Sequence, residues 1–357
     1  MSTIKRDKTI DFVKGFGMLL VLFAHINYIE PVHTIIYSFH MPLFFIVSGM
    51  LFNDKKHRQF KPFLLTRIKT ILLFYLAFVF VSLIYSSFLL FIDQSFTFDY
   101  IINQIKLILL DRTYVDLSGI NNVALWFLPC LFVVEILYFW INKIKHPLLF
   151  FGTISTLVIL GWMLGGFSWA LLPWNLRSAI FSIGFYAIGN RILRPLHNWI
   201  KLNSVKSNKN YIYIYIYIIC TIISLASVVP IALANGTVGL GSSTFSDGIM
   251  FYESGVLGTV FAFSLSMLLS GLKGFQIINY VGKNSLYFMG IHCLFRSLIY
   301  YVFERFNIAT IETINSHWGF SIIAFVVLFV LTFVTVIGIN NIRQKIRDYR
   351  NNRKEFI

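Results

Sequence analysis

The chain has 357 residues, of which 57% are hydrophobic and only 13% are charged, and its mean hydropathy is +0.74. A soluble domain carries about 25% charged residues, so this composition excludes a water-soluble protein. The 38 phenylalanines and 18 tyrosines suit lipid and its interfaces. A net charge of +15 would suggest a nucleic-acid partner in a soluble chain, but its distribution along this sequence gives another explanation.

Ten stretches of the sequence are apolar over the length of about 20 residues that a helix needs to cross a bilayer. We therefore predict an all-α polytopic membrane protein with about ten transmembrane helices. A membrane domain would cover residues 1–345, followed by a basic cytoplasmic tail at 346–357. The predicted spans are 9–29, 34–53, 70–92, 124–142, 148–165, 174–193, 211–234, 249–271, 280–303 and 318–340.

The basic residues orient these spans. Of the 30 Lys and Arg residues, 24 fall on one side if the N-terminus is cytoplasmic, three fall in outer loops and three fall inside spans. Cytoplasmic loops of membrane proteins are enriched in Lys and Arg. We therefore expect both termini to be cytoplasmic and expect no nucleic-acid partner, because the positive charge is explained by topology.

Two local patterns could mislead. Residues 211–217 alternate Tyr and Ile, as a strand does, but an open strand edge is not tolerated in hydrocarbon, so we predict a helix. The three cysteines lie in apolar runs without paired spacing, so we expect free thiols and no metal site. They are Cys130, Cys220 and Cys293.

The first predicted span carries three ionisable residues. Such residues are costly in lipid and usually face a cavity or a partner. Asp11 and Lys14 lie three residues apart and share a face. Lys14 and His25 lie eleven apart, which is three helical turns plus about 20°, or about 16 Å along the axis. We expect this face to line a polar cavity.

The second span places His40 at a depth similar to that of His25. Pro42 frees a backbone carbonyl in this span, which is tolerated where protein or water satisfies it, and Ser48 follows. Histidine titrates near neutral pH and can take a proton from a hydroxyl. An ordinary interhelical hydrogen bond stays open as the alternative for both histidines.

Other polar residues could line the same cavity. Inside the spans these are Glu135, Arg177, Glu253, His292 and Arg296, with Arg177 and Glu253 as a candidate ion pair. Arg67 and Lys69 lie where the third span leaves the inner surface. They could bind the phosphates of a cytoplasmic ligand or serve only as basic anchors.

Four motifs stand out along the chain. They are Asp11-Phe-Val-Lys-Gly-Phe-Gly17 followed by His25, Ser38-Phe-His-Met-Pro-Leu-Phe-Phe45 followed by Ser48-Gly49, Trp126-Phe-Leu128, and Gly282-Lys-Asn-Ser-Leu286 followed by His292. Together these motifs resemble acyltransferase family 3, in particular its fucose 4-O-acetylase-like branch. The resemblance covers the whole chain, including the number of spans.

This resemblance implies a membrane O-acyltransferase that takes an acyl group from cytoplasmic acyl-CoA, usually acetyl-CoA, without a metal. The acceptor would be a hydroxyl of a cell-envelope glycan or a lipid-linked saccharide, and the enzyme would lie in the bacterial cytoplasmic membrane. His25 would be the general base, with Asp11 and Lys14 setting the local charge. Lys14, Arg67 and Lys69 would contact the donor.

The remaining site residues expected to line the substrate cavity are His40, Ser48, Trp126, Glu253, Arg177 and His292. A transient acyl-histidine is a variant of the mechanism. A glycan or organic-acid transporter is the main alternative function, and a scaffold subunit of a polymer-synthesis complex is another. The sequence leaves the acceptor sugar, the acyl chain and the oligomeric state open.

Overall fold

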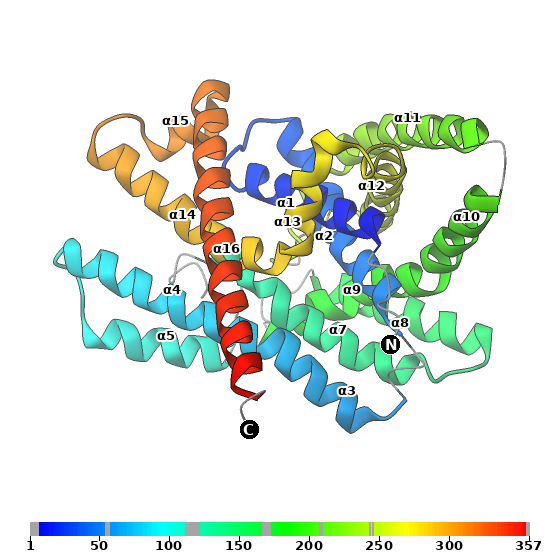
Figure 1. Cartoon of the computed structure of the whole chain (residues 1–357), viewed down its shortest axis with the longest axis horizontal. Helices are drawn as coiled ribbons and strands as arrows, with labels where there is room; N and C mark the ends of the chain where they lie inside the picture. The colour runs from blue at the N-terminus through cyan, green and yellow to red at the C-terminus, as the bar shows by residue number, and fades with distance from the viewer. Residues whose placement is uncertain are drawn as a thin grey trace.

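The computed structural model describes residues 7–53, 58–110, 122–165, 173–206, 210–242, 244 and 246–354. Over these residues the regular secondary structure is helical, apart from one isolated bridge between Gly239 and Thr244. The predicted all-α fold is therefore confirmed. Figure 1 shows the helices gathered around α1 and α2, with α16 crossing the face of the bundle nearest the viewer.

Eight helices are long and apolar enough to cross a membrane, and the chain is an integral multi-pass membrane protein. Two of them join adjacent helical segments: α3 (Phe60–Arg67) with α4 (Leu73–Ile92), and the turn at Val123–Trp126 with α7 (Phe127–Ile141). The others are α2 (Val32–Leu51), α8 (Pro147–Gly165), α11 (Asn210–Asn235), α12 (Gly248–Leu269), α14 (Ser285–Arg305) and α16 (Trp318–Lys354).

The two other predicted spans are shorter helices. The first is α1 (Lys8–Ala24), with 17 residues, which ends earlier than the predicted 9–29. The sixth is α9 (Leu176–Ile188), which continues through a π-helical turn at Gly189–Leu193 into α10 (Arg194–Lys206). The orientation of the bundle in the membrane stays a prediction.

Three further helices complete the described chain, namely α5 (Phe98–Leu110), α13 (Gln276–Lys283) and α15 (Ile311–Ser316). The predicted span 280–303 is therefore interrupted at Asn284, between α13 and α14. The alternating Tyr-Ile segment lies within α11, so its prediction as a helix is confirmed. All three cysteines are free thiols; Cys130 and Cys293 are buried and Cys220 is half-buried.

Helix α2 is the centre of the bundle, where it contacts α1, α9 and α12. It approaches the α9 segment through two glycines. A Cβ on Gly49 would collide with the carbonyl of Tyr186, and one on Gly189 would collide with the carbonyl of Ile46. Asn190 donates to the carbonyl of Gly49 at 3.1 Å, which satisfies a backbone group that the end of α2 leaves free.

Pro42 lies inside α2 without leaving its freed carbonyl unsatisfied. A proline removes the hydrogen bond to the carbonyl four residues earlier, which is that of Ser38. The hydroxyl of Ser254, on α12, donates to this carbonyl at 3.4 Å. The expected satisfaction of the carbonyl by protein is thus confirmed, and it ties α2 to α12 next to His40.

Asp7 ties the start of α1 to α10. It caps α1 by accepting from the backbone of Thr9 at 3.0 Å, and it accepts from His197 at 3.1 Å and Lys201 at 2.7 Å. The hydrogen bond from His197, aided by Lys201, holds the pKa of Asp7 well below its ordinary value of 3.8. A carboxylate with a lowered pKa stabilises the fold above that ordinary value and loses this effect as pH falls below it.

We expect Asp7→Ala to lower the free energy of unfolding by about 1–2 kcal/mol at pH 7, because it removes a helix cap and a charge. Asp7→Asn keeps an oxygen for the cap and removes only the charge. Its deficit relative to the wild type should shrink as pH falls from 7 to 3 in denaturant titrations. A deficit that is constant over this range would contradict the role assigned to the charge.

Candidate active site

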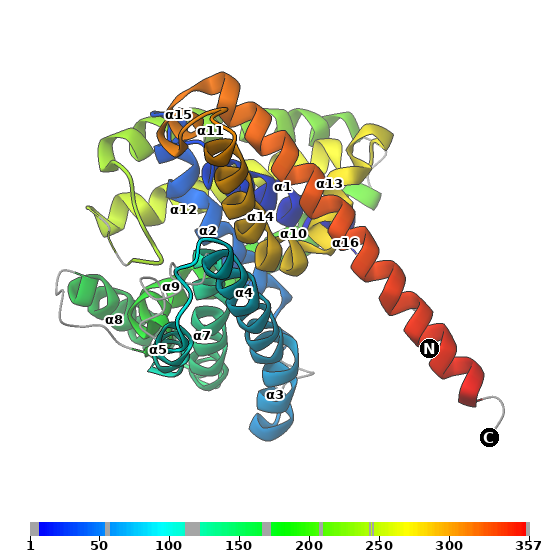
Figure 2. The same cartoon turned by 90° about the vertical axis from the view of Figure 1, so that its left-hand side faces the viewer.

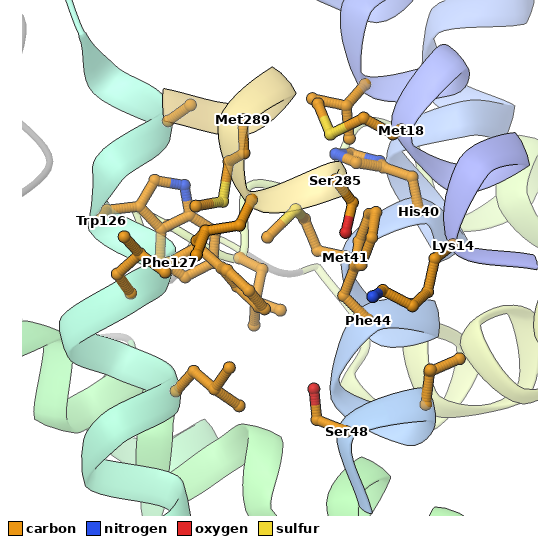
Figure 3. Close-up of a pocket in the computed structure, with 18 of the residues that line it drawn as sticks. Lys14, Met18, His40, Met41, Phe44, Ser48, Trp126, Phe127, Ser285 and Met289 are labelled. Carbon is orange, nitrogen blue, oxygen red and sulfur yellow. The ribbon is translucent and has the colours of Figure 1, made fainter. Parts of the chain in front are cut away.

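A cavity of about 230 Å³ lies between α1, α2, α7 and α14 (Figure 3). Its wall is mostly apolar, with a few polar groups, as is typical of ligand sites. The lining residues with polar or sulfur-containing side chains are Lys14, Met18, His25, Tyr37, His40, Met41, Ser48, Thr70, Trp126, Ser285 and Met289.

The cavity extends a long way through the bundle. At one end it reaches Ser48 and Leu51, in the last turn of α2, and Thr70, in the π-helical turn Ile68–Leu72 between α3 and α4. At the other end it is lined by residues 238–241, in the segment between α11 and α12. In the predicted topology the first end is cytoplasmic and the second faces outward. One cavity therefore borders segments from both sides of the bundle.

Five of the predicted site residues line this cavity. Lys14 and His25 come from α1 and its C-terminal cap, which agrees with the shared face expected from their spacing. His40 and Ser48 come from α2, and Trp126 comes from the turn that precedes α7. Figure 3 shows the side chains of Lys14 and His40 directed into the same space from neighbouring helices.

Other predicted site residues lie elsewhere. Asp11 is buried where α1 crosses α13, with its backbone carbonyl against Gly282, and it is outside the cavity wall. Lys69 and Glu253 are exposed. His292 is fully buried behind His25 rather than on the wall. The spacing of polar residues along a helix shows which of them share a face. It does not show whether that face lines the cavity or packs against another helix.

Arg67 forms a buried ion pair with Glu135. Its Nε lies 2.7 Å from the carboxylate of Glu135, and the two side chains are 18% and 5% exposed. The hydroxyl of Tyr186 donates to the other carboxylate oxygen at 3.3 Å, and the Arg67 guanidinium lies over the Phe63 ring. Both residues lie outside the cavity wall. Arg67 therefore connects α3 to α7, and its charge is already matched within the protein.

Arg177 holds the end of the cavity that is lined by residues 238–241. Its guanidinium donates to the carbonyl of Ser242 at 2.8 Å, and the neighbouring Ser178 hydroxyl donates to the carbonyl of Leu240 at 2.7 Å. The candidate pair with Glu253 does not occur among the ion pairs of the described residues. Arg177 instead holds the backbone of the segment that lines the cavity.

His25 lies at the junction of α1 and α14. It is the C-terminal cap of α1, and Nη1 of Arg296 lies 3.4 Å from its Nδ1 and 3.4 Å from its carbonyl oxygen. Tyr300 donates to the same carbonyl at 3.4 Å and to Asn315 at 2.7 Å. The ring of His292 meets that of His25 edge-on, with centroids 5.1 Å apart. The orientation of His25 is thus set largely by α14.

His40 is held by its own helix. Its Nδ1 lies 2.8 Å from the carbonyl oxygen of Ile36, one turn earlier in α2. A carbonyl oxygen can only accept, so this nitrogen carries the proton. The ring of Tyr37, also on the cavity wall, meets His40 edge-on at a centroid distance of 4.9 Å. His40 is 3% exposed, and its position is fixed by backbone geometry.

His25, His292 and Cys293 bring one donor atom each to within 4.8 Å of one another, a donor set that zinc also uses. The environment of His25 does not favour a cation. A metal-bound histidine donates its other N–H to an acceptor, but the group beside His25 is the guanidinium of Arg296, which can only donate. The same positive charge repels a divalent ion. The cluster fits a hydrogen-bonded group, in which the Cys293 thiol donates to His292 at 3.4 Å.

The structure adds site residues that the sequence did not single out. Tyr37, Thr70 and Met289 line the cavity, as does Ser285, which belongs to the Gly282–Leu286 motif. Arg296 was recognised as a charge within a span, but its contact with His25 joins residues 271 positions apart. In the sequence, only the charge of Arg296 within a span and the motif around Ser285 gave a signal.

The arrangement is suited to transfer chemistry on a hydroxyl. Two histidines and a lysine line one largely apolar cavity, where charged and polar groups act more strongly than in solution. A family model described as an acyltransferase domain, that of acyltransferase family 3, matches residues 7–339. No curated protein and no solved structure gave a match. The chain therefore belongs to acyltransferase family 3 and is a membrane-embedded acyltransferase.

Proposed function

We propose that this acyltransferase transfers an acyl group, most simply acetyl, from cytoplasmic acyl-CoA to a hydroxyl of a cell-envelope or exopolysaccharide glycan. A cavity histidine acts as general base. The enzyme would work in the bacterial cytoplasmic membrane, as the resemblance to the fucose 4-O-acetylase-like branch implies. The observation that carries the proposal is the single cavity, which bears Lys14, His25 and His40 and borders segments from both sides of the bundle.

The donor would enter from the end formed by Ser48, Leu51 and Thr70. The acyl thioester would reach past Lys14 toward the histidines, and the glycan hydroxyl would approach from residues 238–241. Lys69, exposed beside Thr70, is our candidate for contact with the CoA phosphates. Arg67 supports this region through its ion pair with Glu135.

We expect His25→Ala to leave the surface polymer at its normal amount while its O-acyl content falls about 100-fold or more. Loss of a general base or of an oxyanion donor has this order of effect. NMR of the surface glycan from a strain that carries the variant measures both quantities. Unchanged O-acylation with reduced polymer export would instead support a transporter.

A second measurement tests the donor directly. Detergent-purified full-length protein should bind acetyl-CoA and release free CoA thiol from it, with water as the acceptor. A folded, monodisperse sample that neither binds nor cleaves acetyl-CoA would overturn the proposed use of acyl-CoA, whatever the phenotype of the strain.

A further inference from the structure

The hydrogen bonds around the two cavity histidines give them opposite proton positions. In a neutral imidazole one nitrogen carries the proton and the other carries a lone pair. His40 donates from Nδ1 to the carbonyl of Ile36 at 2.8 Å, so its lone pair lies on Nε2. This assignment is firm because the carbonyl has no proton to give.

The environment of His25 selects the other form. Its Nδ1 faces Nη1 of Arg296 at 3.4 Å, and a guanidinium is always charged and has no acceptor. A proton on Nδ1 would point at this cation, whereas a lone pair there is attracted to it. His25 therefore carries its proton on Nε2.

Both Nε2 atoms are available to a ligand. Among the described residues no hydrogen bond reaches either atom, and neither atom belongs to the fully buried polar atoms that lack a partner. Both side chains line the cavity. The cavity thus presents one nitrogen lone pair, from His40, and one N–H donor, from His25.

We propose that the two histidines divide the acyl-transfer step, with His40 as the base and His25 as the donor to the thioester carbonyl oxygen. This rests on the proposed acyl-CoA-dependent function. It differs from the sequence-based expectation for His25, because the contact with Arg296 is visible only in the folded chain.

In this division of roles a single proton passes through His40. The acceptor oxygen forms a bond to the carbonyl carbon of the thioester while its proton passes to Nε2 of His40. Negative charge develops on the carbonyl oxygen and is stabilised by the N–H of His25, with the charge of Arg296 behind it. The carbon–sulfur bond breaks, and the departing CoA thiolate takes the proton from His40. His25 keeps its own proton throughout.

Glutamine separates the two roles, because its amide can donate a hydrogen bond but cannot act as a base. We expect His25→Gln to retain CoA release from acetyl-CoA within about tenfold of the wild type, and His25→Ala to lose about 100-fold or more. His40→Gln and His40→Ala should both lose about 100- to 10,000-fold. Acetyl-CoA binding and thermal melting of each variant control for folding.

The reverse pattern would overturn the division: His25→Gln as inactive as His25→Ala, with activity retained in His40→Ala. Equal loss in all four variants would also overturn it. If the wild type itself does not cleave acetyl-CoA, the proposed function fails instead, so the two failures are distinguishable.

The proton positions on the two histidines can be measured without an enzyme assay. In bilayer samples labelled with ¹⁵N-histidine, solid-state NMR distinguishes a protonated Nδ1 from a protonated Nε2, and the His25→Gln and His40→Gln variants assign the signals. We expect a protonated Nδ1 for His40 and a protonated Nε2 for His25. The same form in both rings, or the opposite forms, would contradict the proposal.

Discussion

Replacing Arg67 with alanine is expected to lower the free energy of unfolding by about 3–5 kcal/mol, because the change leaves a buried carboxylate without its partner. The carboxylate is that of Glu135, which is 5% exposed and lies 2.7 Å from Nε of Arg67. The second contact of Glu135, from Tyr186, is a neutral hydroxyl at 3.3 Å and cannot replace a charge. Unfolding by denaturant in detergent measures the loss.

A double variant tests this explanation. Replacing a buried ion pair by apolar residues of similar volume is often neutral or stabilising, so Arg67→Met with Glu135→Leu should regain most of the stability lost in Arg67→Ala. Lys69→Ala is the matched control, since Lys69 is exposed on the same helical segment, and its stability should not change. Wild-type stability in Arg67→Ala together with a raised KM for acetyl-CoA would instead assign Arg67 to the donor phosphates.

Replacing Gly282 with valine is expected to inactivate the enzyme and to destabilise it by about 1–3 kcal/mol through overpacking. A Cβ on Gly282 would collide with the carbonyl of Asp11 and lie 2.7 Å from the backbone nitrogen of Gly15. A Cβ on Gly15 would collide with the carbonyl of Ile278. The backbones of α1 and α13 are therefore in direct contact, and a side chain at this crossing forces them apart.

The loss of activity should exceed what the loss of stability explains. Helix α1 carries Lys14 and ends at His25, and a misplacement of about 1 Å at a reacting group can cost about 100-fold in rate. CoA release measured on the folded fraction checks this. Gly338→Ala is the control, because open space surrounds this position in α16 and the helix gains up to about 1 kcal/mol. Full activity in Gly282→Val would show that the crossing does not position His25.

Much of the fold could be predicted from the sequence, because lipid imposes a strong rule on length and polarity. The alternating Tyr-Ile segment was correctly predicted as part of a helix, since an unpaired strand edge is excluded from hydrocarbon. Helix ends were less predictable. Apolar composition continues through Ile26, but α1 ends at Ala24, and the apolar run that starts at 280 hides the break at Asn284. Those breaks depend on packing between helices.

The candidate site, like the fold, could be predicted from the sequence only in part. Periodicity along one helix could relate Lys14 to His25, and both line the cavity. It could not pair side chains from distant helices. Arg67 was a candidate for a phosphate site and pairs with Glu135, and Arg177 was a candidate partner of Glu253 and holds the carbonyl of Ser242. Such partners depend on how helices far apart in sequence are placed against each other.

The early end of α1 has a mechanical consequence. Because His25 caps the helix rather than lying within it, its carbonyl is held by Arg296 and Tyr300 of α14. The imidazole of His25 therefore lies where α1 and α14 contact each other. Helix α14 packs in turn on α16, whose last turns extend far beyond the rest of the bundle (Figure 2). The position of the His25 ring therefore depends on how α14 packs on α16, a helix that does not itself line the cavity.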